Sequence, residues 1–206
     1  MDIDSIIRDY YSLIMENKND TFERSIAERI KHLRTQGNLT LDQLASASGV
    51  SRAMISRIER GEASPTAALL ARICAALGLS LSGFFAENED AISPLVKKRD
   101  QPTWRDPDTG YVRRAVSPPR VGSDVDIVEV NLPPHAKVSF PPHAASQSMT
   151  QYIWLLEGNL EMTTGNQVHR MTSGDCLFMP VGDGHTFHNP SDLPARYAVV
   201  LDQRKR

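Results

Sequence analysis

The chain of 206 residues has little of what marks several large protein classes. It has two cysteines, Cys74 and Cys176, which lie far apart and match neither a metal-binding nor a redox spacing. No apolar run approaches the roughly 20 residues that span a bilayer, and the first residues lack the basic segment of a signal peptide. These absences argue against a disulfide-rich secreted protein and a membrane-spanning protein, and we expect a reduced, cytoplasmic protein.

An excess of charge of one sign is also absent. The formal net charge is −2, so no overall positive field attracts the protein to nucleic acid. Any affinity for DNA must therefore come from a local surface. The length suits two modest domains, each able to bury a core of its own.

Proline is nearly absent from the first half of the chain and divides the sequence into two parts. From Thr21 to Ala86 apolar residues recur at helical spacing and only Pro65 interrupts, with Ser64 before it expected to cap a new helix. The other twelve of the thirteen prolines follow Ile92, among alternating stretches and turn clusters that predict strands. Val125 to Val130 is such an alternating stretch, and Thr163 to Asn166 is such a turn.

These shifts predict a multidomain α + β protein with an all-α domain followed by an all-β domain. We place an N-terminal helical leader at 1–20, the helical domain at 21–86, an acidic linker at 87–91 and the strand domain at 92–206. The leader carries an apolar stripe whose role stays open between packing on the first domain and a dimer contact. The stripe consists of Ile3, Ile6, Ile7, Tyr10, Leu13 and Ile14.

Residues 41–60 have the spacing of a helix-turn-helix. Two helices that cross steeply need a small residue at the crossing, a residue able to adopt the left-handed conformation in the turn, and apolar residues on the buried side of the second helix. Ala45, Gly49 and the pair Ile55/Ile58 meet these needs in order. Ser51 is expected to cap the second helix, whose first turn enters the major groove in such proteins.

The side chains of that second helix suit DNA bases. Arg52 and Arg57 lie on the face left exposed when Ile55 and Ile58 turn inward, and a guanidinium can pair with guanine O6 and N7. Ala53 can touch only a thymine methyl. The alternative for either arginine is a solvated surface charge.

The helical half resembles the lambda-repressor-like, or XRE, family of helix-turn-helix domains. The resemblance rests on Ile30–Arg34, Leu39–Ala45, Gly49–Gly61, Pro65 and Ala75–Leu79. It implies base-reading positions at Leu41, Arg52, Ala53 and Arg57, phosphate contacts at Thr40, Ser51 and Arg60, and a structural pair between Glu59 and Arg34. Ser56 completes the predicted DNA-binding set. Because Leu41 replaces the glutamine common in the family, we expect no direct adenine readout by the first helix of the motif.

A second motif, with the spacing G-x5-P-x-G-x2-H-x3-N, runs from Gly174 through Pro180, Gly182 and His185 to Asn189. We expect a hairpin turn at Gly174-Asp175, a strand over 177–179, and a bend that points His185 inward. The motif resembles the second motif of the cupin family, whose small double-sheet jelly-roll barrels hold a ligand or metal at the mouth. The resemblance covers 92–202.

The first cupin motif is incomplete. Residues 141–158 keep its frame, but Gln151 stands where the family has glutamate, His143 is out of register and the H-x-H pair is missing. An amide is a poor ligand for a divalent cation, so we predict no metal or other cofactor. The alternatives are a structural role for His185 and a polar plug at Gln151. Trp154 and Tyr152 are expected to be packing residues, including between two barrels. The predicted effector pocket consists of His143, Gln151, Ile153, Cys176, His185 and Phe187.

The two resemblances together predict a sequence-specific DNA-binding transcriptional regulator and not an enzyme. We expect a homodimer on a two-fold-symmetric operator, with a small-molecule effector in the barrel that modulates DNA binding. The alternatives are a metal-dependent cupin dioxygenase or isomerase and a protein-binding helical domain, as in some antitoxins. The neutral polar groups predicted in the pocket favour a small polar metabolite over a fatty acid, with polyamine, amino-acid and sulfur metabolism left open.

Overall fold

The computed structural model describes residues 24–79, 81–85, 93–119, 121–142 and 149–203. The predicted leader at 1–20 and linker at 87–91 lie outside these residues. Backbone contacts divide the chain into two compact units, Met1–Ser64 and Pro65–Arg206, so the division falls upstream of the predicted linker. Within the described residues no helix is long and apolar enough to cross a membrane.

The described part of the first unit is helical. Residues 24–36 form one helix, followed by α2 (Leu41–Ser48) and α3 (Arg52–Glu59). The N-terminus of α2 is fixed by a capping box, in which Thr40 Oγ1 accepts from Gln43 N and Gln43 Oε1 accepts from Thr40 N. The apolar side chains buried in this unit are Ile26, Ala27, Ile30, Leu44, Val50, Ile55 and Ile58.

The turn between α2 and α3 confirms the predicted helix-turn-helix chemistry. Gly49 ends α2 with φ +64°, in the left-handed region, and its N–H donates to Ala45 O at 2.9 Å. Ser51 then caps α3, because its Oγ accepts from Met54 N at 3.2 Å. These local interactions therefore fix the residues at which α2 ends and α3 begins.

The second unit begins with two helices, α4 (Ala67–Ala76) and α5 (Leu81–Phe85), and the 3-10 turn η1 (Lys98–Asp100). Thr66, and not Ser64 as predicted, caps α4, since the Thr66 Oγ1 accepts from Leu69 N. The prediction was wrong because Pro65 precedes the cap and does not occupy the first helical position. By backbone contacts, α4 and α5 group with the strands of this unit.

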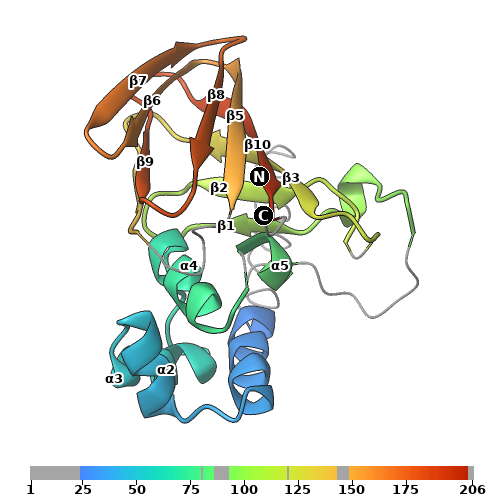
Figure 1. Ribbon diagram of the computed structural model, residues 1–206, viewed down its shortest axis with the longest axis vertical. Coiled ribbons are helices and arrows are strands. Elements are labelled where there is room, and N and C mark those ends of the chain that lie inside the picture. Colours follow the sequence, from blue (N-terminus) through green and yellow to red (C-terminus); the bar gives the residue numbers. More distant parts are fainter. Residues whose placement is uncertain (1–23, 80, 86–92, 120, 143–148, 204–206) are drawn as a thin grey trace, which may run out of the picture. The chain divides into compact units, whose positions relative to one another are not determined.

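Two antiparallel sheets form the rest of the second unit (Figure 1). The six-stranded sheet has the order β1-β2-β3-β10-β5-β8 and the four-stranded sheet the order β4-β9-β6-β7. The predicted strand at 125–130 is confirmed, and of the predicted turn at 163–166 only Gly165-Asn166 form the turn, because Thr163 and Thr164 belong to β6. The strands are β1 (Thr103–Arg105), β2 (Val112–Ala115), β3 (Val125–Leu132), β4 (Lys137–Phe140), β5 (Thr150–Glu157), β6 (Asn159–Thr164), β7 (Gln167–Thr172), β8 (Cys176–Pro180), β9 (His185–His188) and β10 (Ala195–Asp202).

The Gly174-Asp175 turn differs from the prediction. It does not close a hairpin, because β7 lies in the four-stranded sheet and β8 in the six-stranded one. The turn instead carries the chain from one sheet to the other and pairs with β5. Gly174 N donates to Leu155 O at 2.8 Å, and Leu155 N donates to Asp175 O at 2.9 Å.

The segment around β9 is held in place on both sides of His185. Gly184 has φ +75°, and a Cβ there would lie 2.7 Å from Cδ of Pro142, so no larger residue fits without displacement. Asn189 is buried, and its Nδ2 donates to Leu132 O and Leu193 O. These contacts explain the asparagine at the end of the C-terminal motif and fix the two ends of β9.

Candidate nucleic-acid interface and ligand pocket

The two faces of α3 separate cleanly. Ile55 and Ile58 are buried, whereas Arg52, Ala53 and Arg57 are exposed. The helix therefore presents two guanidiniums, with a small side chain beside the first of them. This is the arrangement expected of a helix that enters the major groove.

Arg52 has an acidic neighbour in the first unit. Its Nε lies 3.2 Å from Asp42 Oδ1, and both side chains are exposed. Exposed pairs of this kind contribute about 0–1 kcal/mol, so Arg52 can exchange Asp42 for a base or a phosphate at little cost. No hydrogen bond or ion pair joins the Arg57 guanidinium to another described residue.

The predicted phosphate-contacting residues lie at the ends of α2 and α3. Thr40 and Ser51 each use an oxygen lone pair for capping, which leaves the hydroxyl hydrogen able to donate to a phosphate. Arg60 contacts Ser56 and forms an ion pair with Glu62, with 2.6 Å between Arg60 Nε and Glu62 Oε1. The hydrogen bond with Arg60 lowers the pKa of the Glu62 carboxyl.

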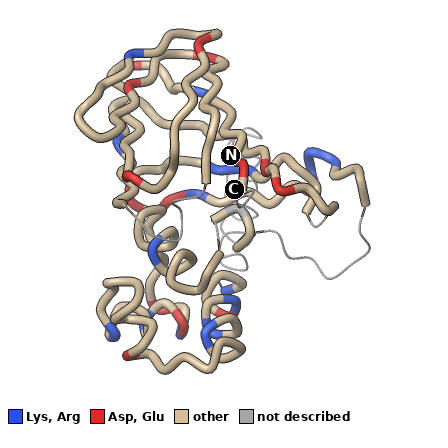
Figure 2. The backbone as a smooth tube through the Cα atoms, in the orientation of Figure 1, with Lys and Arg blue, Asp and Glu red and all other residues tan. Residues whose placement is uncertain are grey.

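The net charge of residues 24–64 is positive, opposite in sign to that of the whole chain. Residues 24–64 hold seven Lys and Arg and four Asp and Glu, whereas the complete chain has a net charge of −2. Figure 2 shows Lys and Arg repeated along the helix of residues 24–36. Leu41, the remaining predicted base reader, is half-buried at the start of α2. The local positive charge that DNA binding requires is present.

Arg34 and Glu59 join the first helix to the end of α3. The pair is bidentate, with 2.7 Å between Arg34 Nε and Glu59 Oε1 and 2.9 Å between Arg34 Nη2 and Glu59 Oε2. The two side chains are only 13% and 6% exposed. Arg34 Nη1 also donates to Leu39 O, and the hydrogen bond with Glu59 raises the pKa of Arg34. The predicted structural pair is confirmed.

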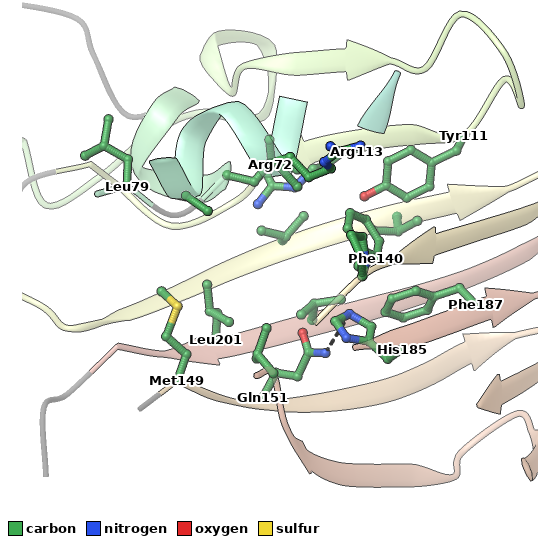
Figure 3. Close-up of a pocket in the computed structure, with 18 residues that line it drawn as sticks. Arg72, Leu79, Tyr111, Arg113, Phe140, Met149, Gln151, His185, Phe187 and Leu201 are labelled. Carbon is green, nitrogen blue, oxygen red and sulfur yellow. Dashed lines mark hydrogen bonds between the residues drawn. The ribbon is translucent and has the colours of Figure 1, made fainter. Parts of the chain in front are cut away.

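The second unit contains a cavity of about 130 Å³ (Figure 3). Its walls come from the inner faces of β2, β3, β4, β5, β9 and β10, and from one side of α4. Figure 3 shows Arg72, Arg113 and Tyr111 on one side of the cavity and Gln151 and His185 on the other. Most of the remaining lining is apolar, including Phe140 and Phe187.

The structure brings together three of the six residues predicted for the pocket. Gln151, His185 and Phe187 line the cavity. Ile153 is buried in the core but is not part of the lining. His143 lies outside the described residues.

Cys176 is not a pocket residue, so that prediction was wrong. It is exposed and pairs with Trp154, which also faces outward. Side chains alternate along a strand, and the inward positions of β8 are Leu177 and Met179.

Gln151 and His185 join the two sheets at the cavity. Gln151 Nε2 lies 3.3 Å from His185 Nε2, and burial lowers the pKa of His185 to about 4. The imidazole is therefore neutral near pH 7. Because the amide nitrogen can only donate, His185 Nε2 accepts and the ring proton resides on Nδ1. This Nδ1 is buried and has no hydrogen-bond partner.

The residues at the cavity do not fit a metal. No group of three or more His, Cys, Asp or Glu in the described part of the chain is placed to hold an ion. Gln151 and His185 supply one amide and one imidazole, and two guanidiniums line the same cavity. Positive side chains so close oppose a divalent cation.

Sequence reasoning missed Arg72, Arg113 and Tyr111. In the sequence, Arg113 stands beside Arg114 and suggests an exposed pair of charges. In the structure its register partners Trp104 and Val130 are buried, so Arg113 faces inward. The sequence signal that could have placed Arg113 inward was strand alternation, because residues two apart along a strand share a face and Tyr111 is aromatic. Arg72 could not be found this way, because only the packing of α4 against the strands brings it to the cavity.

Comparison with known proteins identifies both parts of the chain. Residues 30–84 match the model of the helix-turn-helix family, and residues 128–201 match that of the cupin domain. The protein therefore combines an XRE-type helix-turn-helix with a cupin domain, and the predicted fold class, an all-α helix-turn-helix domain followed by an all-β jelly roll, is confirmed.

Several transcriptional regulators are similar to the chain over most of their length. The chain is 23% identical over 182 residues to the HTH-type transcriptional regulator SutR of Escherichia coli, covering 88% of this chain and 97% of SutR. It is 26% identical over 165 residues to PuuR of the same organism, covering 80% and 87%. The crystal structure of an HTH_3 family transcriptional regulator from Vibrio cholerae superimposes with a TM-score of 0.76 and 28% identity, covering 90% of this chain and 99% of that one.

Proposed function

We propose that the protein is a sequence-specific DNA-binding transcriptional regulator that acts in the cytoplasm as a homodimer. The exposed face of α3, with Arg52 and Arg57 on a helix capped at Ser51, carries the proposal. These arginines read bases in the major groove, with Leu41 and Ala53 beside them. Thr40, Ser51, Ser56 and Arg60 hold the phosphates.

The relatives support a regulator in place of an enzyme. SutR and PuuR are both transcriptional regulators, and each is similar to this chain over most of its length. The amide at Gln151 and the guanidiniums in the cavity also argue against the metal-dependent reactions of other cupins. The protein is accordingly a regulator whose barrel serves binding and not catalysis.

Selection from randomised DNA duplexes tests the DNA-binding role. The purified full chain is expected to enrich one sequence with two-fold symmetry, with half-site centres about one helical turn, 34–36 Å, apart. The selection is run at about 50 mM and about 200 mM salt, because phosphate contacts weaken as salt rises. If no sequence is enriched at either concentration, the protein does not bind an operator unaided.

The outer face of the six-stranded sheet is the proposed dimer surface. Tyr152, Trp154 and Phe178 are about half exposed, at 48%, 51% and 51%, and lie beside one another on β5 and β8. Across β10 and β3 the same face continues with Val200 and Ile127. A second copy is the occupant we propose, since operator binding by this kind of domain requires two heads and a two-fold-symmetric contact.

Trp154→Glu is expected to convert the dimer to a monomer. Placing a charge in the centre of an apolar contact removes an aromatic anchor worth about 2 kcal/mol or more, so the dimer dissociation constant rises about 30-fold or more. Light scattering coupled to size exclusion gives the mass of each species. Val168→Glu, at an exposed apolar position on β7 of the other sheet, is the matched control and stays dimeric. A Trp154→Glu variant that remains dimeric would rule out this face.

A ligand in the cavity can act on the helical region through α4. Ala71, Arg72 and Ala75 place one side of α4 in the cavity wall. The buried carboxylate of Asp106 accepts from Ala67 N and so fixes the N-terminus of α4 to the β1–β2 turn. Along the chain, α4 follows α3 after residues 60–66. We infer that a ligand with different affinities for two positions of α4 shifts the operator affinity.

A further inference from the structure

We propose that the cavity binds a small carboxylate, whose negative charge lies against Arg113 and Arg72 and whose far end accepts a hydrogen bond from His185. The proposal rests on the proposed function of the cavity as an effector site and names the class of the effector. It narrows the polar metabolites suggested by the sequence to anions.

Arg113 is the first observation. It is only 7% exposed and lines the cavity from β2. Its guanidinium stacks over the Phe85 ring at 5.7 Å and hydrogen-bonds with Tyr111, a phenol kept neutral because burial raises its pKa to about 12. Burial also lowers the pKa of Arg113 itself, so the surroundings oppose its charge. A carboxylate in the cavity would offset that cost through charge-assisted, bidentate hydrogen bonds.

The charge of the lining is the second observation. Arg72, on α4, adds another guanidinium to the same wall, and none of the described residues that line the cavity is Asp or Glu. Asp126 is the carboxylate whose charge acts on Arg113, but it is outside the lining and hydrogen-bonds with Gln203. Two positive groups at one cavity attract an anion and repel an amine.

The opposite side of the cavity supplies the third observation. His185 is 9% exposed, and its Nδ1–H has no partner, while Gln151 occupies its Nε2. A buried donor without an acceptor costs free energy. Because this nitrogen has almost no accessible surface, the ring must turn toward the cavity before a ligand oxygen can accept from it, and that hydrogen bond would recover the cost. The ring of Phe140 stacks on His185 at 5.2 Å and supplies an apolar wall between the two polar ends.

The volume limits the size of the ligand. A cavity of about 150 Å³ in another protein holds benzene, which has six non-hydrogen atoms, so this one, at about 130 Å³, suits a molecule of similar size, roughly four to eight non-hydrogen atoms. A short carboxylate with a second polar group meets all three observations. A long fatty acid does not fit.

Calorimetry on the full chain tests the class of ligand. The probes are mono- and dicarboxylates of roughly four to eight non-hydrogen atoms, each beside its amide, with succinate, succinamide and 1,4-diaminobutane as the central matched set. At least one carboxylate is expected to bind tenfold or more tightly than its amide, since charged hydrogen bonds are the stronger ones, and the diamine is expected not to bind. If no carboxylate binds, or if an amide or the diamine binds as tightly, the proposal fails.

Variants place the bound anion. Arg72→Gln and Arg113→Gln are each expected to weaken the carboxylate on the order of 10- to 100-fold, while Arg170→Gln, at an exposed arginine on β7, leaves it unchanged. Circular dichroism checks folding, and if Arg113→Gln does not fold, the half-buried Arg72→Gln decides. Equal affinity in a folded variant and wild type would overturn the placement. Operator affinity is measured in parallel: carboxylate binding that leaves it unchanged would support the ligand class and sink only the proposed coupling to DNA.

Discussion

The double variant Arg52→Ala/Arg57→Ala is expected to bind the operator more weakly than wild type, by about a thousandfold or more. Each arginine contact with guanine is worth about 1–3 kcal/mol of discrimination, and a dimer loses two such contacts per subunit. Both side chains are exposed on α3, so their removal leaves the buried face of the helix intact. Fluorescence anisotropy on the duplex selected from the randomised library gives the two affinities.

The control for that variant must also lose two positive charges, but from a surface away from α3. Arg99→Ala/Arg170→Ala removes two exposed arginines from the second unit and is expected to bind within a few-fold of wild type. Non-specific DNA separates base reading from general attraction, since it should bind both double variants with similarly low affinity. Equal weakening by the two double variants would mean that α3 reads no bases.

Glu59→Gln is expected to destabilise the first unit by about 1.5–3 kcal/mol, the range of a hydrogen bond to a charged group. The substitution leaves the Arg34 guanidinium, only 13% exposed, without its carboxylate, and breaks the link between the first helix and α3. Urea unfolding of the full chain, followed by circular dichroism at the helix signal, measures the loss. DNA binding should fall with it, because α3 can read bases only while its buried face is held.

Two further variants isolate the contribution of the Arg34–Glu59 pair to stability. Glu62→Gln breaks the exposed pair with Arg60 and is expected to leave the urea midpoint nearly unchanged, because exposed pairs are screened by solvent. Arg34→Met/Glu59→Met replaces both charges by apolar groups and should recover most of the stability lost in Glu59→Gln. If Glu59→Gln and Glu62→Gln have the same small effect, the Arg34–Glu59 pair does not hold the unit together.

The helix-turn-helix was predictable from the sequence because its determinants are local. Ser51 caps α3 through a residue three positions on, and Gly49 ends α2 through its own backbone conformation. The inward face of α3 follows from the spacing of Ile55 and Ile58. The cap of α4 shows the limit of such rules, since a shift of two residues, from Ser64 to Thr66, was enough to make the prediction wrong.

Only some of the residues that line the cavity were predictable, because they come from segments far apart in the sequence. Spacing within the cupin motifs identified Gln151 and His185, which the structure places 3.3 Å apart. Arg113 and Arg72 come from β2 and α4, and no motif links them to the barrel mouth. With these two guanidiniums the cavity favours an anion, whereas the sequence predicted a pocket of neutral groups. Cys176 was misplaced because a one-residue error in strand parity reverses the face.

Sequencing of genomic DNA recovered by the purified protein, with and without a low-molecular-weight extract of the cells, tests the central claim most directly. We expect two-fold-symmetric sites that are lost in Arg52→Ala/Arg57→Ala and whose recovery by wild type changes when the extract is added. The change should be absent in Arg72→Gln, which alters the cavity and not α3. Recovery of the same fragments by wild type and the α3 double variant would contradict the account.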